Sequence, residues 1–222
     1  MHVYSIDKDI RTKVVVALFV ASIFISMILQ YFLREPIEII IIFIRKVEIV
    51  DLLFQAVSFF DVLVDVMSVP TIYAILSIWF DKKLWKIKCI NDWLGVPDLN
   101  GTWSGTATSS YRGNSKYSMK LKIKQTWNKI SFIAVFPDTH SKSESNCASF
   151  FIESNGDKKI GFGFINRSRE VNSQQYDGYN ILELDSKNEI SGRYFNNRDN
   201  SSVALKGGNK GQFELKRIQS DS

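Results

Sequence analysis

Few residues of this 222-residue chain are spaced for catalysis or for metal binding. The two histidines, His2 and His140, lie far apart, and no histidine or cysteine cluster has the spacing of a zinc site. The serine within residues 101–105 is misplaced for the nucleophile elbow of a hydrolase, and no phosphate-binding loop motif is present. The sequence therefore predicts no catalytic residue, no metal site, no cofactor and no enzymatic activity.

Small polar residues instead recur at alternating positions in the second half of the chain. Ser141, Ser143 and Ser145 are spaced by two, and Gly161 and Gly163 alternate with phenylalanines. Residues spaced by two share one face of a strand. An interior built only for packing would contain more branched aliphatic residues, so this pattern predicts a partly polar cavity.

The strands that would enclose such a cavity follow from hydrophobic alternation. Tyr117, Met119, Leu121 and Ile123 alternate with polar residues, which is typical of a half-buried strand. Seven other segments have similar patterns and are joined by turn-forming residues. The eight predicted strands span residues 101–110, 117–124, 129–136, 143–153, 158–166, 178–184, 189–196 and 211–217.

Eight sequential antiparallel strands predict an up-and-down β-barrel, because closure removes the unpaired edges of an open sheet. A barrel of this size holds either side chains or one small ligand. All twelve glycines follow residue 90, and the composition changes at residues 95–98. We therefore expect an α-helical transmembrane part, residues 1–94, followed by an all-β domain, residues 95–222.

The first part contains long apolar segments. Residues 14–33 carry no charge, and twenty residues at about 1.5 Å each cross a hydrocarbon core of roughly 30 Å. A second span is predicted at residues 59–80, where apolar side chains offset Asp61 and Asp65. The competing window, residues 37–54, has charges near its middle that disfavour insertion.

Asp61 and Asp65 are four residues apart and so share one face of a helix. They either reach the headgroup region or face basic residues of segment 37–54; alternatively, acids inside a membrane segment mark an assembly seam. Basic residues flank the two spans and place both ends in the cytoplasm, although a three-span topology would place the second domain outside. Cys89 and Cys147 are expected to be reduced thiols.

The net charge of +5 belongs entirely to residues 98–222, which allows an anionic partner without requiring one. Lys120, Lys122 and Lys124 alternate along one predicted strand. We interpret them as the solvated face of the barrel, where they could also lie toward anionic lipid headgroups. No DNA or RNA partner is predicted.

Several motifs, in the same order along the chain, are more distinctive. The Gly-x-Trp at residues 101–103 resembles the start of a lipocalin barrel. The wider pattern resembles the two-transmembrane β-strand-rich effector family of bacterial CBASS anti-phage systems over most of residues 98–217. Residues 176–178 depart from it, because relatives often have a histidine before the glycine. The matching motifs lie at residues 98–105, 123–127, 141–145, 162–166 and 192–198.

The resemblance implies a multi-pass receptor in the bacterial inner membrane. Its cytoplasmic eight-stranded barrel would bind a cyclic dinucleotide made by a cognate nucleotidyltransferase, in a role like that of STING. Binding would drive homo-oligomerisation and disruption of the lipid bilayer, leading to abortive infection. The alternative is a membrane-tethered, lipocalin-like binding or interaction module for a small apolar ligand.

Under this resemblance, the pocket needs donors for two phosphates and flat surfaces for two bases. Arg198 is the candidate for phosphate, and Trp127 and Tyr194 are the candidates for stacking. Each candidate also has a structural interpretation, as core packing or as a satisfied polar group of a strand or loop. The remaining candidates would read base edges or donate to phosphate and ribose: Gln125, Asn166, Asn196, Thr106, Ser143 and Ser145.

Overall fold

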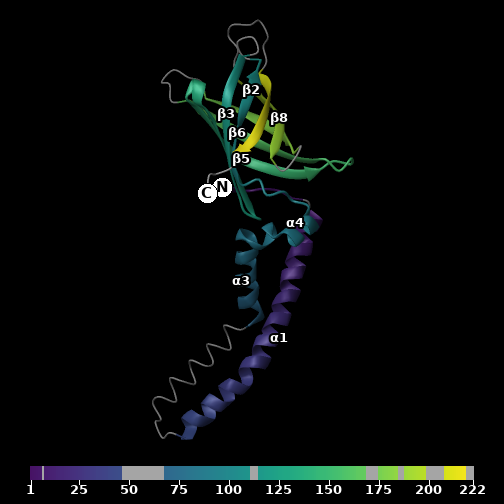
Figure 1. The fold of residues 1–222 in the computed structure, drawn as a ribbon, viewed down its shortest axis with the longest axis vertical. Helices are drawn as coiled ribbons and strands as arrows, with labels where there is room; N and C mark the ends of the chain where they lie inside the picture. Colours follow the sequence, from purple (N-terminus) through teal and green to yellow (C-terminus); the bar gives the residue numbers. More distant parts are fainter. Residues whose placement is uncertain are drawn as a thin grey trace. The chain divides into compact units, whose positions relative to one another are not determined.

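The computed structural model describes residues 1–6, 8–46, 68–110, 115–168, 175–184, 188–198 and 208–218. The chain folds as two compact units (Figure 1). One consists of Met1–Lys8 together with Lys86–Ser222, and the other of Asp9–Trp85. The strands belong to the first unit and the long helices to the second.

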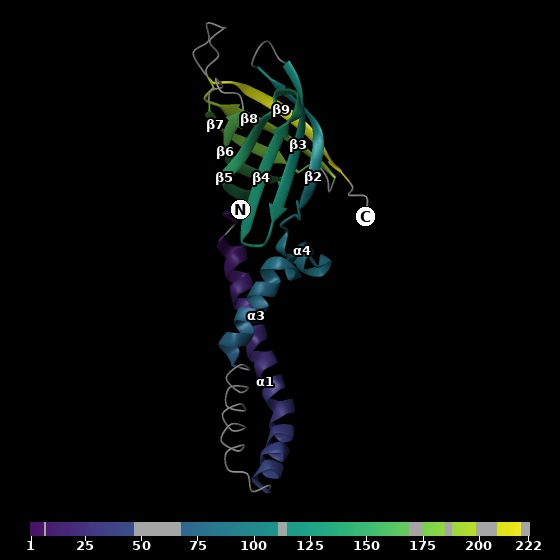
Figure 2. The ribbon, with the colours of Figure 1, turned by 90° about the vertical axis from the view of Figure 1, so that its left-hand side faces the viewer.

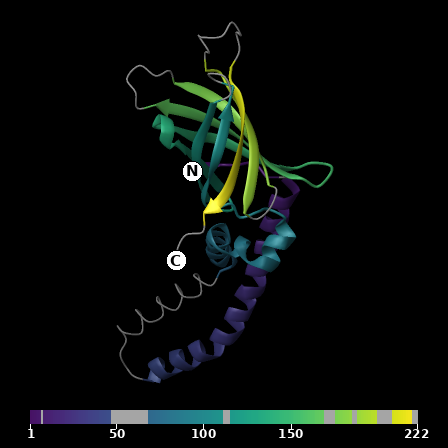
Figure 3. The ribbon, with the colours of Figure 1, turned by 45° about the horizontal axis from the view of Figure 1, so that its top comes forward.

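Eight strands form a closed antiparallel β-barrel (Figure 2 and Figure 3). Each strand pairs with the next in sequence, and β2 pairs with β9 to complete the circle. This arrangement confirms the predicted fold class and the predicted strand segments, whose ends differ by a few residues. The strands are β2 (Gly101–Ser109), β3 (Ser115–Gln125), β4 (Lys129–Phe136), β5 (Ser141–Ile152), β6 (Lys158–Ser168), β7 (Tyr176–Glu183), β8 (Glu189–Asn196) and β9 (Lys210–Ile218).

Alternation along the strands separates the core from the outer surface. In β3, Met119, Leu121 and Ile123 are buried, whereas the lysines between them are exposed. Each buried aliphatic side chain of this size stabilises the fold by about 1.5–3 kcal/mol relative to leaving it in water. The period of two therefore fixes which face of each strand enters the barrel.

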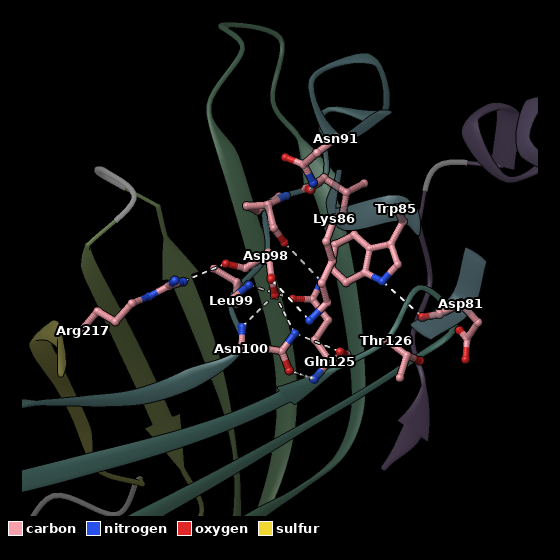
Figure 4. Close-up of polar contacts among 12 residues, drawn as sticks. Asp81, Trp85, Lys86, Asn91, Asp98, Leu99, Asn100, Gln125, Thr126 and Arg217 are labelled. Atoms are coloured by element: carbon pink, nitrogen blue, oxygen red, sulfur yellow. Dashed lines mark hydrogen bonds and ion pairs between the residues drawn. The ribbon is translucent and has the colours of Figure 1, made fainter. Parts of the chain in front are cut away.

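Trp103 fills one end of the barrel, which we call the closed end. Its side chain is completely buried, and its indole N–H donates to the carbonyl of Leu99 at 3.1 Å. The guanidinium carbon of Arg217 lies 4.5 Å from the centroid of the indole ring, and Nη2 donates to the carbonyl of Asp98 at 2.7 Å (Figure 4). Stacking and hydrogen bonding thus tie β2 and β9 to the chain that enters the barrel.

Gln125 completes the closed end from β3. Its Oε1 accepts from the backbone N–H of Leu99 at 2.9 Å, and its Nε2 donates to the carbonyl of Pro97 at 3.2 Å and to the Tyr4 hydroxyl at 3.3 Å. The backbone N–H of Gln125 donates to Oδ1 of Asn100 at 2.7 Å (Figure 4). Every polar atom of this buried side chain is therefore paired within the protein.

The short strand β1 (His2–Val3) joins the barrel, which the sequence analysis did not foresee. It pairs antiparallel with β4, placing His2 opposite Ile130 and Val3 opposite Lys129. Beyond it, Ser5 bridges Ser149 of β5 in parallel orientation. The segment was assigned to the membrane part because a two-residue strand has no detectable alternation.

β1 fills a gap between two strands of the barrel, which we call the β4–β5 seam. Direct pairing of β4 with β5 covers only residues 133–136 and 141–144, and β5 bulges between Ser145 and Cys147. Across the gap, Ser5 donates its N–H to Ala148 and accepts from the N–H of Phe150. Residues 1–6 therefore satisfy backbone groups that the diverging strands leave open.

Short helical segments complete the barrel unit. α4 (Lys88–Leu94) ends at Gly95, whose φ of 67° is the left-handed conformation common after a helix and favourable for glycine. η2 (Pro137–Thr139) joins β4 to β5. η1 (Leu84–Lys86) precedes α4 and contains the boundary between the two units along the chain. Cys89 and Cys147 are exposed free thiols, as the sequence analysis expected.

The helical unit contains α1 (Lys8–Lys46) and α3 (Val69–Lys82). Within the described residues, one segment, Asp9–Phe32 of α1, is long and apolar enough to cross a membrane. It overlaps the predicted first span, residues 14–33. The predicted second span, residues 59–80, is described only from residue 68 onward.

The two helices contact each other through aromatic side chains. The rings of Phe19 in α1 and Tyr73 in α3 meet edge to face with centroids 6.3 Å apart. Asp61 and Asp65, the candidates for an assembly seam, lie outside the described residues. Their role stays a prediction.

Candidate functional site

A cavity of about 340 Å³ lies inside the barrel at the end opposite Trp103, which we call the open end. All eight barrel strands contribute to its lining, together with η2 and the residues flanking the β8–β9 connection. Its volume lies at the lower end of the range of small-molecule sites, roughly 300–1,000 Å³. The barrel interior is therefore not filled along its whole length.

Aromatic side chains form the apolar part of the cavity wall. The rings of Phe132 and Phe162 stack in parallel, with centroids 4.1 Å apart and planes at 3°. Both side chains are buried, as are Met119 and Phe213 beside them in the lining. This part of the wall offers flat apolar surface without hydrogen-bonding groups.

Buried amides and hydroxyls form the polar part of the wall. Asn166 is 1% exposed and donates its Nδ2 to Oγ of Ser143 at 2.8 Å. Asn180 and Ser109 are also buried and line the same space. Unlike an aliphatic core, this wall can exchange hydrogen bonds with a polar ligand.

Tyr194 carries a phenol into the cavity from β8. Burial raises its pKa above the ordinary value, and a hydrogen bond with Ser109 lowers it by a smaller amount. The phenol is therefore protonated at neutral pH. It can both donate a hydrogen bond and present an aromatic face to a ligand.

Arg198 lies at the cavity rim, where a network of amides holds its backbone. Oδ1 of Asn196 accepts from the N–H of Arg198 at 3.1 Å and from the N–H of Asn209 at 3.3 Å. Nδ2 of Asn209 donates to the carbonyl of Arg198 at 3.1 Å. The guanidinium carbon lies 5.3 Å from the centroid of the Tyr176 ring, within the range of a cation–π contact.

Two charged residues of opposite sign line the cavity, Arg198 and Asp138 of η2. Oδ2 of Asp138 accepts from the backbone N–H of Ser118 at 2.6 Å, so this carboxylate has a structural role. Arg198 can attract an anionic ligand, whereas Asp138 would repel an anionic group placed close to it. The cavity therefore has a positively charged group after β8 and a negatively charged group on η2.

Five of the nine predicted ligand residues line this cavity. They come from β5, β6, β8 and the residue pair following β8, and they meet because antiparallel alternation turns each of them inward. These residues are Ser143, Asn166, Tyr194, Asn196 and Arg198.

The structure places the other four elsewhere. Thr106 is exposed on the outer wall, because Ala107 is the inward residue of that part of β2. Gln125 and Trp127 are buried at the closed end. Ser145 lies in the β4–β5 seam.

Ser145 is engaged in the seam by its hydroxyl. Its Oγ lies 2.8 Å from Nε2 of His2 and accepts from the backbone N–H of Phe132 at 2.9 Å. Ser145 lies opposite Phe164 of β6 in regular register with Ser143, but β4 no longer pairs with β5 beyond Glu144, so the Ser145 hydroxyl meets the β4 backbone and His2 instead. A spacing of two was therefore not sufficient to place Ser145 in the cavity.

The lining residues that sequence reasoning did not name as ligand candidates include Tyr117, Tyr176, Asn180 and Asn209. Tyr117 and Asn180 carried a usable signal, because each lies on the inward face of a predicted strand. Tyr176 was assigned to a loop because the predicted strand at residues 178–184 began later than β7 does. Asn209 lies one residue before β9 and so carried no strand signal.

Two solved structures resemble the chain distantly. One, titled "Structure of EF1p2_mFAP2b bound to DFHBI", has a TM-score of 0.37 and 11% identity, covering 54% of this chain and 94% of that one. The other is a DUF3598-family protein of unknown function from Nostoc punctiforme, with a TM-score of 0.35 and 15% identity, covering 54% of this chain and 47% of that one. Neither similarity bears on function.

The curated relative and the family match are more informative. CD-NTase-associated protein 15 of Yersinia aleksiciae is 28% identical over 137 residues, which are 59% of this chain and 63% of that protein. The chain thus matches somewhat less than two thirds of the length of this relative. The model of the family described as "Cap15, cyclic dinucleotide receptor domain" matches residues 94–217, the α4 end and the whole barrel. The chain therefore belongs to the Cap15 cyclic dinucleotide receptor domain family of CBASS effectors.

Proposed function

We propose that the open-end cavity is the cyclic dinucleotide site and that ligand binding makes the chain oligomerise and disrupt the bacterial inner membrane. The observation that supports the site most directly is the convergence of Arg198, Tyr176 and Tyr194 with buried amides in one cavity. The role proposed for the barrel is that of a receptor, without catalysis.

Arg198 is the proposed phosphate ligand. A guanidinium offers two parallel N–H donors to a phosphate, and such charge-assisted bonds are roughly twice as strong as neutral ones. Its backbone is fixed by Asn196 and Asn209, so little ordering of the main chain is needed when a ligand arrives. Tyr176, the present cation–π partner, can keep the guanidinium oriented across the rim.

The bases are proposed to stack on tyrosines and to be read by amides. Tyr117, Tyr176 and Tyr194 come from three different strands and line the same end of the barrel. Stacking of a base on an aromatic side chain contributes about 1–3 kcal/mol. Asn166 and Asn180 have both donors and acceptors and can address the base edges.

The helical unit is the proposed membrane-active part. Side chains along Asp9–Phe32 are largely exposed in the chain, with Phe19 at 51%, Phe24 at 60% and Met27 at 61%. Such surface suits contact with lipid or with other copies of the same helix. Clustering of these helices would be the step that damages the bilayer.

The site proposal is tested by thermal unfolding of the full chain in detergent micelles. A panel of cyclic dinucleotides, the matching linear dinucleotides and a fatty acid would be compared at equal concentration. A cyclic dinucleotide present at 100 times its Kd stabilises the bound form by about 2.7 kcal/mol, so the melting temperature should rise. A rise with the fatty acid alone would instead favour the lipocalin-like alternative, and no rise with any nucleotide would contradict the proposal.

The membrane step needs a separate measurement. The chain reconstituted in dye-loaded vesicles should release dye when the cyclic dinucleotide identified above is added, and its oligomer size should increase in the same samples. Binding without release or growth of the oligomer would refute the proposed membrane step and leave the receptor role intact.

A further inference from the structure

Three consecutive strands, β2, β3 and β4, form one basic side of the barrel, which we call the lysine wall. Their sequences contain no aspartate and no glutamate. Their outward positions carry five exposed lysines: Lys116, Lys120, Lys122, Lys124 and Lys129. Four of these lysines lie on β3 and the fifth is the first residue of β4, while β2 carries no charged residue, so the wall is a region of one charge sign centred on β3.

The wall lysines have no acidic partner among the residues that the structure describes. In the part of the chain that the structure describes, none of the five forms an ion pair, whereas Lys142, Lys159 and Lys216 on other strands do. Their charge is consequently not neutralised locally by the protein. It is available to an external anionic surface.

Aliphatic and hydroxyl side chains surround the wall lysines. Lys120 lies opposite Val135 and Lys122 opposite Ile133 on β4, and Val135 is 39% exposed. On the other side, Lys122 lies opposite Thr102 of β2. Lysines spaced by two along a strand are about 6.8 Å apart, and their stems can lie over apolar groups while the ammonium groups reach phosphates.

This composition favours a lipid surface over a nucleic acid. Proteins that bind single-stranded nucleic acid combine positive charge with exposed aromatic or arginine stacking surfaces. The outward positions of β2, β3 and β4 contain neither aromatic residues nor arginine. Mixed lysine, hydroxyl and aliphatic groups instead suit the headgroup region of a bilayer.

The covalent connection also favours a membrane. Val3 of β1 pairs with Lys129 of the wall, and Ile6 is buried in the barrel unit. Only Asp7 and Lys8 separate Ile6 from the candidate membrane span that begins at Asp9. So short a tether gives the barrel a high effective concentration of the headgroups around that span.

We propose that the lysine wall docks the barrel onto anionic headgroups of the bilayer that holds α1. This inference rests on membrane insertion of α1 but not on nucleotide binding. Each lysine adds a favourable contribution close to an anionic surface, and the total declines with ionic strength.

The test uses the full chain in nanodiscs made of phosphatidylcholine alone or with about one third phosphatidylglycerol. A fluorophore on S118C, in a C89S/C147S background, reports proximity to quencher groups attached to lipid headgroups. Ser118 is an exposed residue of the wall. We expect stronger quenching in the anionic nanodiscs and its loss at about 0.5 M salt.

Two triple variants provide a matched comparison. K120Q/K122Q/K124Q should lower the ratio of docked to undocked barrel in anionic nanodiscs by on the order of 100-fold. K142Q/K159Q/K216Q removes the same number of charges from other strands and should leave that ratio within about threefold. Equal losses in the two variants would overturn the proposal, as would equal quenching of the unsubstituted chain in neutral and anionic nanodiscs.

Other outcomes remain distinguishable. Lysine-dependent binding of a mixed-sequence duplex to the chain in neutral nanodiscs, as tight as docking to anionic lipid, would assign the wall to nucleic acid and overturn the proposal. A chain that does not stay in either nanodisc would refute membrane insertion of α1, and with it this inference. Because no cyclic dinucleotide is present, none of these results bears on the receptor site.

Discussion

The two ends of the barrel use buried polar residues in opposite ways. At the closed end, Gln125 is fully hydrogen-bonded to the backbone and to Tyr4. At the open end, Asn166 and Asn180 are equally buried but line an internal space. The comparison teaches that burial of an amide does not by itself mark a ligand site; what matters is whether the amide faces an internal space, since Asn166 also has a protein partner, Ser143.

Side-chain size produces this difference along the same strands. In β2, the inward residues change from Trp103 at the closed end to Ala107 and Ser109 at the open end. The closed end is consequently packed like an ordinary core, whereas the open end leaves room for a ligand. One barrel thus contains a stabilising half at the closed end and, at the open end, the half that we propose to be the binding half.

The largest effect, on the free energy of unfolding, should come from removing the side chain that fills the closed end. Trp103→Ala removes a fully buried indole and its hydrogen bond to Leu99, and should lower the free energy of unfolding by about 3–5 kcal/mol. Urea unfolding of the full chain in detergent measures this change. Trp93→Ala, at a residue that is 58% exposed, should change it by less than about 0.5 kcal/mol. Similar losses in both variants would show that the closed end is not the stabilising half.

A second substitution addresses the open end. Arg198→Gln removes the proposed phosphate ligand and should weaken cyclic dinucleotide binding about 10- to 100-fold, while the melting temperature without ligand hardly changes. Calorimetric titration measures the affinity. The control is Arg193→Gln. Arg193 lies on β8, the strand that precedes Arg198, and its side chain is exposed on the outer wall. An unchanged Kd for Arg198→Gln would remove this residue from the site.

A substitution at Gln125 distinguishes its two interpretations, as a ligand residue or as a structural residue of the closed end. Gln125→Ala leaves the N–H of Leu99 without its buried acceptor and should cost about 1–3 kcal/mol of stability. Affinity for the cyclic dinucleotide should stay within about twofold, because the residue lies at the end away from the cavity. An affinity at least tenfold weaker, measured on the folded fraction, would show that Gln125 belongs to the binding half.

The smallest effect is the pH dependence of stability that His2 contributes at the β4–β5 seam. Burial lowers the pKa of His2 below its ordinary value of 6.5, so the folded chain keeps the imidazole neutral while the unfolded chain binds a proton. Stability should therefore fall as the pH decreases below about 6.5 and level off below the folded pKa. The difference between the melting temperatures at pH 7.5 and at pH 5.5 measures this loss of stability. This difference should shrink in His2→Gln and persist in His140→Asn.

Much of the fold was predictable because alternation is strong where one strand face is buried. β3 shows this best, since Met119, Leu121 and Ile123 are separated by lysines over its whole length. The strand β1 was not predictable, because its two residues pair with β4 through backbone groups that carry no sequence signature. Tertiary context alone places them there.

The candidate site was predictable only in part. Alternation shows which residues face inward, as it did for Ser143 and Tyr194, but it does not say how far along the barrel an inward residue lies. Gln125 and Trp127 face inward at the closed end. The packing of that end had to be known before they could be distinguished from residues that line the cavity. Ser145 was misplaced because β4 separates from β5 beyond Glu144, and the alternation within β5 does not show where its neighbouring strand diverges.

The insertion of β1 also has a consequence for biosynthesis. The strand partner of His2, Ile130, is made more than a hundred residues after it. Pairing of segments so distant in sequence is slow, because a long loop must close before any contact forms. The candidate membrane span Asp9–Phe32 is therefore made before the seam can be sealed, and closure of the barrel wall is a late event of folding.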